Sequence, residues 1–434
     1  MKRIQILLFI YIVLFSFGTM AQSKNRPNSQ AGNTKKDSVE GVNLFKIAYF
    51  GSSVPYGQGA TNNDGYTNIY TKILDERTKN GGYPWETVNI SIPGNNTVGV
   101  LNRYTRDLTS KKLKYVIFAL ALGNEGIHEN GEPAFDQFKK NIKILVEKAR
   151  ADGMTPVITN SYTRNDYNLV DYGYIKQMNL FIHLLDVPSV NLLGAVDDLK
   201  GRWSNGYWAD SAHPNDKGHR EMAYTLVPSL FDALNNKKPI PKKLDSSSSI
   251  LKKRNHTVLS FVPENIVHPF TVAFTFNSSS SGKLMAIEGA DGESTISNEN
   301  GVLKYTSPKG NAIIGKTPIN DGKWHKVVFT HYHAEGVSTL YCDSTAQGNV
   351  KGKLFINSIK FGGNEMPKKV FYRDLMFWRS GMNSEEVRYI TRDSLLKSSL
   401  ELYAPLSGAR KKLNKANIVN LAQSRNKLVL IEKD

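Results

Sequence analysis

A serine and a histidine in the first half of the chain have sequence surroundings that suit acyl-transfer chemistry. Ser53 lies in the serine block (residues 50–59), directly after a short apolar run. A tight turn from a strand into a helix exposes a serine hydroxyl and turns backbone N–H groups toward the reacting carbonyl. In the histidine block (residues 210–215), Asp210 stands three residues ahead of His213. A carboxylate in that place can accept the imidazole N–H, which leaves the other ring nitrogen to take a serine proton.

Two further blocks carry groups that can stabilise an oxyanion. The glycine block (93–97) contains Gly94, which can present its backbone N–H, and the asparagine block (122–125) contains Asn124. An amide side chain is a hydrogen-bond donor with no charge to titrate. Taken singly, each of the four blocks also fits an ordinary turn or a helix cap, so the chemistry requires a fold that brings them together.

Residues 44–236 alternate short apolar strands with amphipathic helices. The expected strands are 47–50, 87–92, 115–122, 155–159 and 190–192, and the expected helices are 66–78, 98–108, 133–151, 174–185 and 217–234, the last with a kink or break at Pro228. This alternation predicts an α/β domain with a parallel sheet covered by helices on both faces. Working residues in such sheets lie on loops at the carboxyl ends of the strands, where three of the four blocks are expected.

The second half of the chain has a different pattern. Residues 237–254 are rich in Lys, Pro and Ser and are predicted to form a linker. Residues 255–434 contain short, often alternating strands separated by turn-rich stretches, with one clear helix over 384–394. This pattern predicts an antiparallel β-sandwich of the jelly-roll kind.

The first 21 residues resemble a secretory signal peptide. Lys2 and Arg3 precede an apolar run over 6–17, and Ala21 is a small residue at the expected cleavage point. The run is short for a bilayer span, although an uncleaved anchor helix is the alternative. Residues 22–43 are predicted to be a flexible leader. We therefore expect an exported protein, periplasmic or secreted.

Composition limits the partners and the covalent chemistry. The only cysteine, Cys342, cannot form an intrachain disulfide and is expected to be buried. The net charge of +17 can attract anionic polysaccharide or lipid headgroups, or can serve surface solubility alone. No nucleic-acid-binding module and no metal-ligand spacing is visible, so we expect no nucleic-acid partner, no metal and no cofactor.

The order and spacing of the four blocks resemble the SGNH hydrolases, also called GDSL esterases and lipases. The resemblance covers residues 46–234 and implies a flavodoxin-like three-layer domain and a serine esterase. It implies Ser53 as nucleophile and Asp210 with His213 as the orienting acid and the base. It also implies that the oxyanion is held by the backbone N–H groups of Ser53 and Gly94 and by the Asn124 amide.

The sequence departs from the family pattern at two places. These departures bear on which substrate is expected and not on which reaction is expected. The usual Asp before the nucleophile is Ser52, and the usual Gly-x-Asn-Asp has Leu122 and Glu125 at its first and last positions. None of these is a group that does chemistry in the family mechanism. Ser52 is an alternative nucleophile, one residue out of register.

Two features bear on the ligand. Trp203, Tyr207 and Trp208 precede the histidine block and are candidates to stack on a sugar, or else they pack the loop. Residues 321–329 are similar to the strand entry of laminin-G-like, concanavalin A-like sandwiches, which implies a glycan-binding module with no identifiable ligand set, or a structural module.

Three functions remain open at this point. The first is an exported serine esterase that deacetylates a polysaccharide or another carbohydrate. The second is a lipid or short-chain acyl esterase, such as a lysophospholipase. The third is a non-catalytic, glycan-binding surface protein.

Overall fold

The computed structural model of the chain describes residues 41–244, 249–252, 257–406 and 418–431. The predicted signal peptide over 1–21 and nearly all of the predicted leader lie outside these residues. No helix within the described ranges is long and apolar enough to cross a lipid bilayer.

The first part of the chain is an α/β domain with a five-stranded sheet in the order β2-β1-β3-β4-β5. The strands are β1 (Asn43–Gly51), β2 (Glu86–Asn89), β3 (Leu113–Ala119), β4 (Thr155–Thr159) and β5 (Ser189–Val190). All neighbouring strands pair in parallel, as predicted. The order reverses direction around β1, and ligands of such sheets bind beside that switch point, at the carboxyl ends of the strands.

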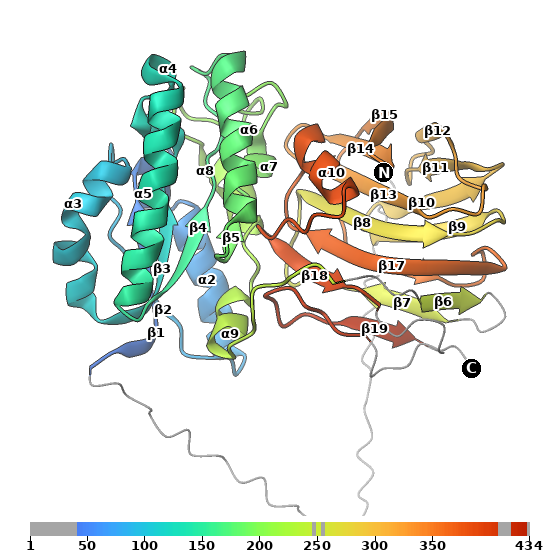
Figure 1. Cartoon of the computed structure of the whole chain (residues 1–434), viewed down its shortest axis with the longest axis horizontal. Helices are drawn as coiled ribbons and strands as arrows, with labels where there is room; N and C mark the ends of the chain where they lie inside the picture. Colours follow the sequence, from blue (N-terminus) through green and yellow to red (C-terminus); the bar gives the residue numbers. More distant parts are fainter. Residues whose placement is uncertain (1–40, 245–248, 253–256, 407–417, 432–434) are drawn as a thin grey trace, which may run out of the picture. The chain divides into compact units, whose positions relative to one another are not determined.

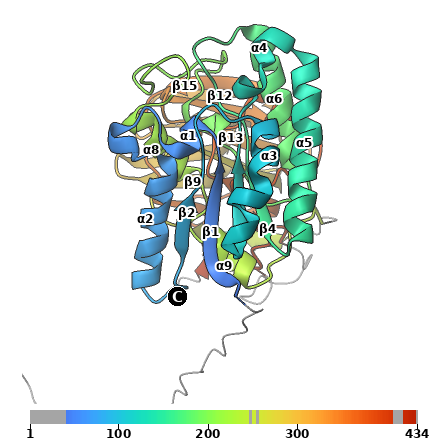
Figure 2. The same cartoon turned by 90° about the vertical axis from the view of Figure 1, so that its left-hand side faces the viewer.

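Helices cover both faces of this sheet (Figures 1 and 2). They are α1 (Ser53–Tyr56), α2 (Tyr66–Lys79), α3 (Thr97–Asp107), α4 (Ile127–Asn130), α5 (Glu132–Ala151), α6 (Leu169–Leu184), α7 (Leu193–Val196), α8 (Asp216–Tyr224) and α9 (Leu230–Asn235). Figure 2 shows α2 and α8 on one side of the sheet and α3, α5 and α6 on the other. Each side encloses its own apolar cluster, because alternate residues of the strands point to opposite faces.

In the α/β domain, two helices differ from the sequence prediction by more than one residue in their limits. The helix expected over 217–234 is divided into α8 and α9. Pro228, where a kink or break was predicted, lies between them, because proline cannot continue a helix. Helix α6 begins earlier than expected because the Asn168 side chain accepts the backbone N–H groups of Val170 and Asp171 and so caps the helix.

The second part of the chain is an antiparallel β-sandwich, as predicted. One sheet has the order β12-β11-β10-β9-β16-β7-β19, and the other has the order β15-β14-β13-β8-β17-β18 with β6 also paired to β17. The strands of the first sheet are β7 (Val258–Phe261), β9 (Gly282–Gly289), β10 (Gly292–Glu299), β11 (Val302–Thr306), β12 (Ala312–Pro318), β16 (Ser358–Gly362) and β19 (Leu428–Ile431). Those of the second are β6 (Ser249–Lys252), β8 (Phe270–Asn277), β13 (His325–Tyr332), β14 (Val337–Cys342), β15 (Thr345–Lys351), β17 (Lys369–Trp378) and β18 (Leu400–Ala404).

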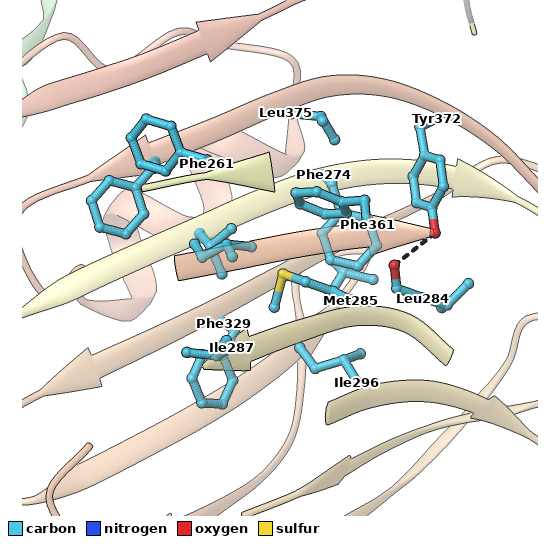
Figure 3. Packing of buried hydrophobic residues seen from close by; sticks show 14 of the residues in the cluster. Phe261, Phe274, Leu284, Met285, Ile287, Ile296, Phe329, Phe361, Tyr372 and Leu375 are labelled. Atoms are coloured by element: carbon cyan, nitrogen blue, oxygen red, sulfur yellow. Dashed lines mark hydrogen bonds between the residues drawn. The ribbon is translucent and has the colours of Figure 1, made fainter. Parts of the chain in front are cut away.

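The sandwich core is rich in aromatic rings (Figure 3). Phe274, Phe361 and Tyr372 pack against one another, with centroid distances of 5.3 to 6.0 Å. The Tyr372 hydroxyl donates a 2.7 Å hydrogen bond to the Leu284 carbonyl, which satisfies its polar end inside the core. Cys342 is buried in this cluster. Strand β6 lies within the segment predicted as linker, so part of that segment extends the second sheet.

Buried polar groups join the α/β domain to the sandwich. Glu386, on α10 (Ser384–Thr391), accepts hydrogen bonds from Asn179 (2.6 Å), Asn191 (2.7 Å) and His183 (2.9 Å) of the α/β domain. The His183 ring is neutral, because its Nδ1 accepts the backbone N–H of Ser398 and its Nε2–H donates to Glu386, and both side chains are essentially inaccessible to solvent. Because buried polar groups need their partners, the two domains of the described chain hold one another in place.

Candidate active site

Glycine at the end of β1 makes the turn before Ser53 possible. A Cβ atom on Gly51 would lie 2.0 Å from the Ala119 carbonyl oxygen of β3, so no other residue fits there. Helix α1 then begins at Ser53 and ends after one turn at Gly57, which has a left-handed φ of 108°. The strand, turn and short helix place the Ser53 hydroxyl at the carboxyl edge of the sheet.

Ser53, His213 and Asp210 form a continuous hydrogen-bonded chain. The Ser53 Oγ lies 2.9 Å from His213 Nε2, and His213 Nδ1 lies 2.9 Å from both carboxylate oxygens of Asp210. Because an ionised carboxylate only accepts hydrogen bonds, Nδ1 carries the ring proton and Nε2 presents its lone pair to the serine. Ser52, the alternative nucleophile, is fully buried, and the hydrogen bond to His213 is made by Ser53.

The Asp210 carboxylate is held ionised by its partners. Partial burial raises the pKa of this carboxyl group. Hydrogen bonds from His213 and from the backbone N–H of Ala212 lower the pKa by more than burial raises it, so the pKa lies below its usual value. Asp210 also accepts the backbone N–H of His213 at 2.9 Å. The same carboxylate therefore fixes both the loop and the imidazole ring.

The glycine and asparagine blocks lie together at the same edge. The Asn124 side-chain amide donates a 2.9 Å hydrogen bond to the Asn95 carbonyl, which uses one of its two N–H donors and fixes its orientation. Gly94 is exposed and has a left-handed φ of 78°. The structure thus brings the two predicted oxyanion donors onto adjoining turns.

Arg103 joins the glycine block to the serine block and was not identified from the sequence. It is buried, and its guanidinium donates to the Asn95 side chain (2.6 Å), the Ile90 carbonyl (2.8 Å) and the Gly51 carbonyl (3.3 Å). The planar fork of arginine can satisfy several acceptors at once. In the sequence, an arginine on an amphipathic helix looks like a surface residue. Only the fold shows that Arg103 links the glycine block to the serine block.

Glu125 braces the asparagine block. Its carboxylate accepts the backbone N–H of Thr97 at 2.5 Å and the side-chain amide of Gln137 at 2.9 Å. Thr97 is the first residue of α3, where an acidic group also interacts favourably with the helix dipole. The departure from the family pattern at Glu125 therefore has a structural role, the attachment of α3 to α5.

His219 supports the loop that follows Ser53. Its Nε2–H donates to the Gln58 carbonyl (3.0 Å), and its Nδ1 accepts the backbone N–H of Tyr66 (3.2 Å). With one nitrogen donating and the other accepting, the ring is neutral, and burial lowers its pKa to about 4. It acts as a spacer between α8 and the serine loop.

Gly59 sets the distance between the serine loop and His213, and we expect Gly59→Ala to lower kcat/KM at least about tenfold. A Cβ atom there would lie 2.2 Å from the Pro214 carbonyl oxygen and 3.0 Å from His213 Cβ, and φ is 94°. Hydrolysis of p-nitrophenyl acetate measures the effect.

Gly81→Ala is the matched control, because Gly81 has a similar φ of 85° and a Cβ atom there would meet nothing within 4 Å. Equal losses in both variants would mean that backbone strain, and not displacement of His213, causes the effect.

Two of the three aromatic residues proposed to stack on a sugar are core residues. Trp203 is 3% exposed, stacks on Tyr162 at 5.6 Å and donates its indole N–H to the Ser211 carbonyl. Tyr207 is 8% exposed, and its hydroxyl accepts a 2.9 Å hydrogen bond from Lys353 of the sandwich. Their rings are used in packing the histidine loop, which is the alternative that the sequence left open for them.

Trp208 remains available at the surface. It is 41% exposed and forms an isolated bridge with Pro214, next to His213. Tyr56, three residues after the nucleophile, and Ile92, two residues before Gly94, are exposed to a similar extent. The chain segments that carry the site therefore also expose apolar side chains.

Asp197 anchors the start of the histidine loop, and we expect Asp197→Asn to stabilise the protein above neutral pH. Asp197 pairs with Trp203 in a bridge and accepts hydrogen bonds from Tyr172 (2.6 Å) and from the backbone N–H of Leu199 (2.9 Å). Burial raises its pKa to about 7. The folded state thus retains a proton that the unfolded chain releases near pH 4. The free energy of unfolding therefore falls as the pH rises from about 4 to about 7, by on the order of 4 kcal/mol in total, and levels off above pH 7.

Thermal melts between pH 5 and 8 test this expectation. The difference in Tm between Asp197→Asn and the parent should grow with pH. Asp198→Asn makes the same charge change one residue away and should follow the parent curve. A constant difference for Asp197→Asn across this range would contradict the account.

Comparison with known proteins defines the class of the α/β domain. Residues 49–221 match the sequence model of the GDSL-like Lipase/Acylhydrolase family. Residues 49–221 therefore form a GDSL-like hydrolase domain, in agreement with the parallel α/β sheet described above. No curated protein matches the sequence.

Solved structures similar to this chain include two hydrolases and a pentraxin. An acetylxylan esterase from Geobacillus stearothermophilus, solved as a catalytic mutant, is 16% identical, with 41% of this chain and 90% of that chain covered and a TM-score of 0.35. The lipase Lip_vut3 from a goat rumen metagenome is 16% identical, with coverages of 42% and 94% and a TM-score of 0.36. A heptameric SAP-like pentraxin from Limulus polyphemus is 12% identical, with coverages of 43% and 95% and a TM-score of 0.30.

Proposed function

We propose that the chain is an exported serine esterase in which Ser53 is the nucleophile, His213 the general base and Asp210 the group that orients it. The observation that carries this proposal is the hydrogen-bonded chain from Ser53 Oγ through the imidazole to the Asp210 carboxylate. A serine hydroxyl is a weak nucleophile until a base removes its proton, and this arrangement supplies the base in the correct tautomer.

The reaction proceeds in two steps. His213 Nε2 takes the proton of Ser53 as Oγ bonds to the ester carbonyl carbon, and the carbonyl oxygen becomes an oxyanion. This oxygen accepts hydrogen bonds from the backbone N–H groups of Ser53 and Gly94 and from the second N–H of the Asn124 amide. The imidazolium then protonates the departing alcohol. Water, deprotonated by the same imidazole, releases the acid from the serine ester.

Carbohydrate acetyl esters are the substrate class that we favour. The exposed rings of Trp208 and Tyr56 lie on the segments that carry the site, and aromatic faces can stack on sugars. The predicted signal peptide and the net charge of +17 fit an enzyme that meets anionic polysaccharide outside the cell. Lipid ester hydrolysis is the second candidate, supported by the same exposed apolar side chains.

A substrate panel distinguishes these functions. The purified protein is assayed with p-nitrophenyl acetate, with longer p-nitrophenyl esters and with acetylated xylan. We expect the highest kcat/KM on the acetate and release of acetate from xylan. A preference for long acyl chains would favour a lipid esterase, and no hydrolysis of any ester would favour the non-catalytic glycan-binding alternative.

Asn124→Ala tests the oxyanion assignment, and we expect kcat to fall about 10²–10³-fold with a smaller change in KM. The lost donor acts on charge that develops only in the transition state, so substrate binding is affected less. Asn130→Ala is the control, since Asn130 also donates to a backbone carbonyl but lies in α4. A KM effect without a kcat effect in Asn124→Ala would contradict this role.

A further inference from the structure

Three side chains from distant parts of the sequence meet where the two domains touch. Glu221 lies on α8, His268 lies between β7 and β8, and His333 directly follows β13. A carboxylate oxygen and two imidazole nitrogens of these residues lie within 4.8 Å of one another. Glu221 and His333 are buried, and His268 is partly exposed. Because the three positions are so far apart in sequence, no ligand spacing reveals them.

The hydrogen bonds around His333 leave one ring nitrogen with a lone pair. Its Nδ1 lies 3.2 Å from the Leu354 carbonyl oxygen. A carbonyl only accepts, so Nδ1 carries the proton and Nε2 carries the lone pair. Histidines that bind metals typically donate their other ring N–H to a carbonyl or a carboxylate in this way, which fixes both the tautomer and the ring orientation.

His268 is positioned from both sides. Its Nδ1 lies 2.9 and 3.1 Å from the two oxygens of Glu221, so this nitrogen carries a proton donated to the carboxylate, and a cation bound between the two groups would displace that proton. The His268 ring stacks on His333 with centroids 4.1 Å apart and planes 19° from parallel. Tyr224 and Phe355 pack edge-on against this pair at 4.8 and 5.7 Å from His268. The carboxylate and the two imidazoles therefore form a small polar cluster with aromatic rings packed against it.

We propose that Glu221, His268 and His333 bind a divalent cation of the zinc class. Two imidazoles and one carboxylate are a common ligand set for Zn²⁺, with water at the fourth position. Mg²⁺ and Ca²⁺ prefer sites built from oxygen ligands, so this set selects against them. The esterase reaction does not require this cation.

A second cluster in the sandwich does not suit a cation. His325, Cys342 and Asp343 also lie close together. However, His325 Nδ1 faces Asp343 at 2.7 Å and Nε2 faces Asp321 at 2.9 Å. Both ring nitrogens then carry protons, and unlike His268, which faces one carboxylate, the doubly protonated His325 ring is held between two carboxylates with no nitrogen lone pair to offer a metal.

A cation at the first cluster would fasten the sandwich to the last part of the catalytic domain. Helix α8 begins three residues after His213, so it leaves the catalytic loop directly. Glu221 on this helix and two sandwich segments would share one ion, which would stabilise the folded chain relative to the unfolded chain.

Zinc binding to the full chain without an affinity tag tests the proposal. The protein is treated with EDTA, desalted and titrated with ZnCl₂ by calorimetry, and its Tm is measured with and without the metal. We expect one Zn²⁺ per chain and a rise in Tm, with no rise for MgCl₂ at the same concentration. Absence of zinc binding, or an equal effect of MgCl₂, would overturn the proposal.

Variants locate the site. His268→Gln and Glu221→Gln should each weaken zinc binding by more than about 100-fold, with metal-free melting curves to confirm that both variants fold. His268 is partly exposed, so its replacement should be tolerated even where a change at buried His333 is not. His325→Gln and the exposed His128→Gln are controls and should bind zinc as the parent does. Loss of binding in His325→Gln, with binding retained in His268→Gln, would refute the assignment.

Discussion

The Ser53→Ala variant is expected to fold normally and to hydrolyse p-nitrophenyl acetate at least about 10⁴-fold more slowly than the parent. The change removes the oxygen that forms the covalent bond, and the side-chain hydrogen bond lost with it is the 2.9 Å contact with His213. A retained Tm together with a lost rate separates loss of chemistry from loss of structure.

Ser52→Ala is the matched control for this experiment. Ser52 is the neighbouring residue and is fully buried, so its replacement tests damage to the turn without touching the proposed nucleophile. We expect Ser52→Ala to keep most of the rate. If Ser52→Ala were inactive and Ser53→Ala active, the nucleophile would be Ser52 and the register of the serine block would be wrong.

Glu386→Ala is expected to lower the stability of the protein by about 3–5 kcal/mol, because each buried donor left unpaired costs about 1–3 kcal/mol. The Glu386 carboxylate is inaccessible to solvent and accepts hydrogen bonds from Asn179, Asn191 and His183. Truncation leaves these donors buried and unpaired, which costs more than the contacts themselves contribute. The midpoint of urea unfolding measures the loss.

Glu385→Ala controls for the loss of a negative charge on the same helix. Glu385 forms a more exposed ion pair with Lys176, and such pairs contribute about 0–1 kcal/mol. Similar destabilisation by both changes would mean that helix charge, and not the buried network, holds the junction together.

The sequence contains local signals for the segments that the structure brings together at the candidate site. Ser53, Gly94 and Asn124 were predicted from short strands that end in turns, and alternation of strands with helices is enough to place such residues along one sheet edge. The Asp210–His213 spacing is also local, since one turn of three residues brings carboxylate and imidazole together. The sandwich was predictable because alternating short strands have few other solutions.

The residues that the sequence did not reveal depend on contacts between distant segments. Arg103 and His219 look like ordinary helix residues, and only the fold shows that they hold the serine and glycine blocks. For Trp203 and Tyr207 the sequence left sugar contact and loop packing both open, because a sequence pattern does not tell whether an aromatic side chain in a loop packs inward. The Glu386 network joins residues that lie about 200 positions apart.

Reaction of the protein with a serine-directed fluorophosphonate, followed by intact mass and peptide mapping, tests most directly whether Ser53 is activated by His213. The account predicts one adduct per chain, located on Ser53, and labelling that is strongly slowed in His213→Ala. An adduct on a different serine, or labelling of Ser53 at an unchanged rate without His213, would contradict it.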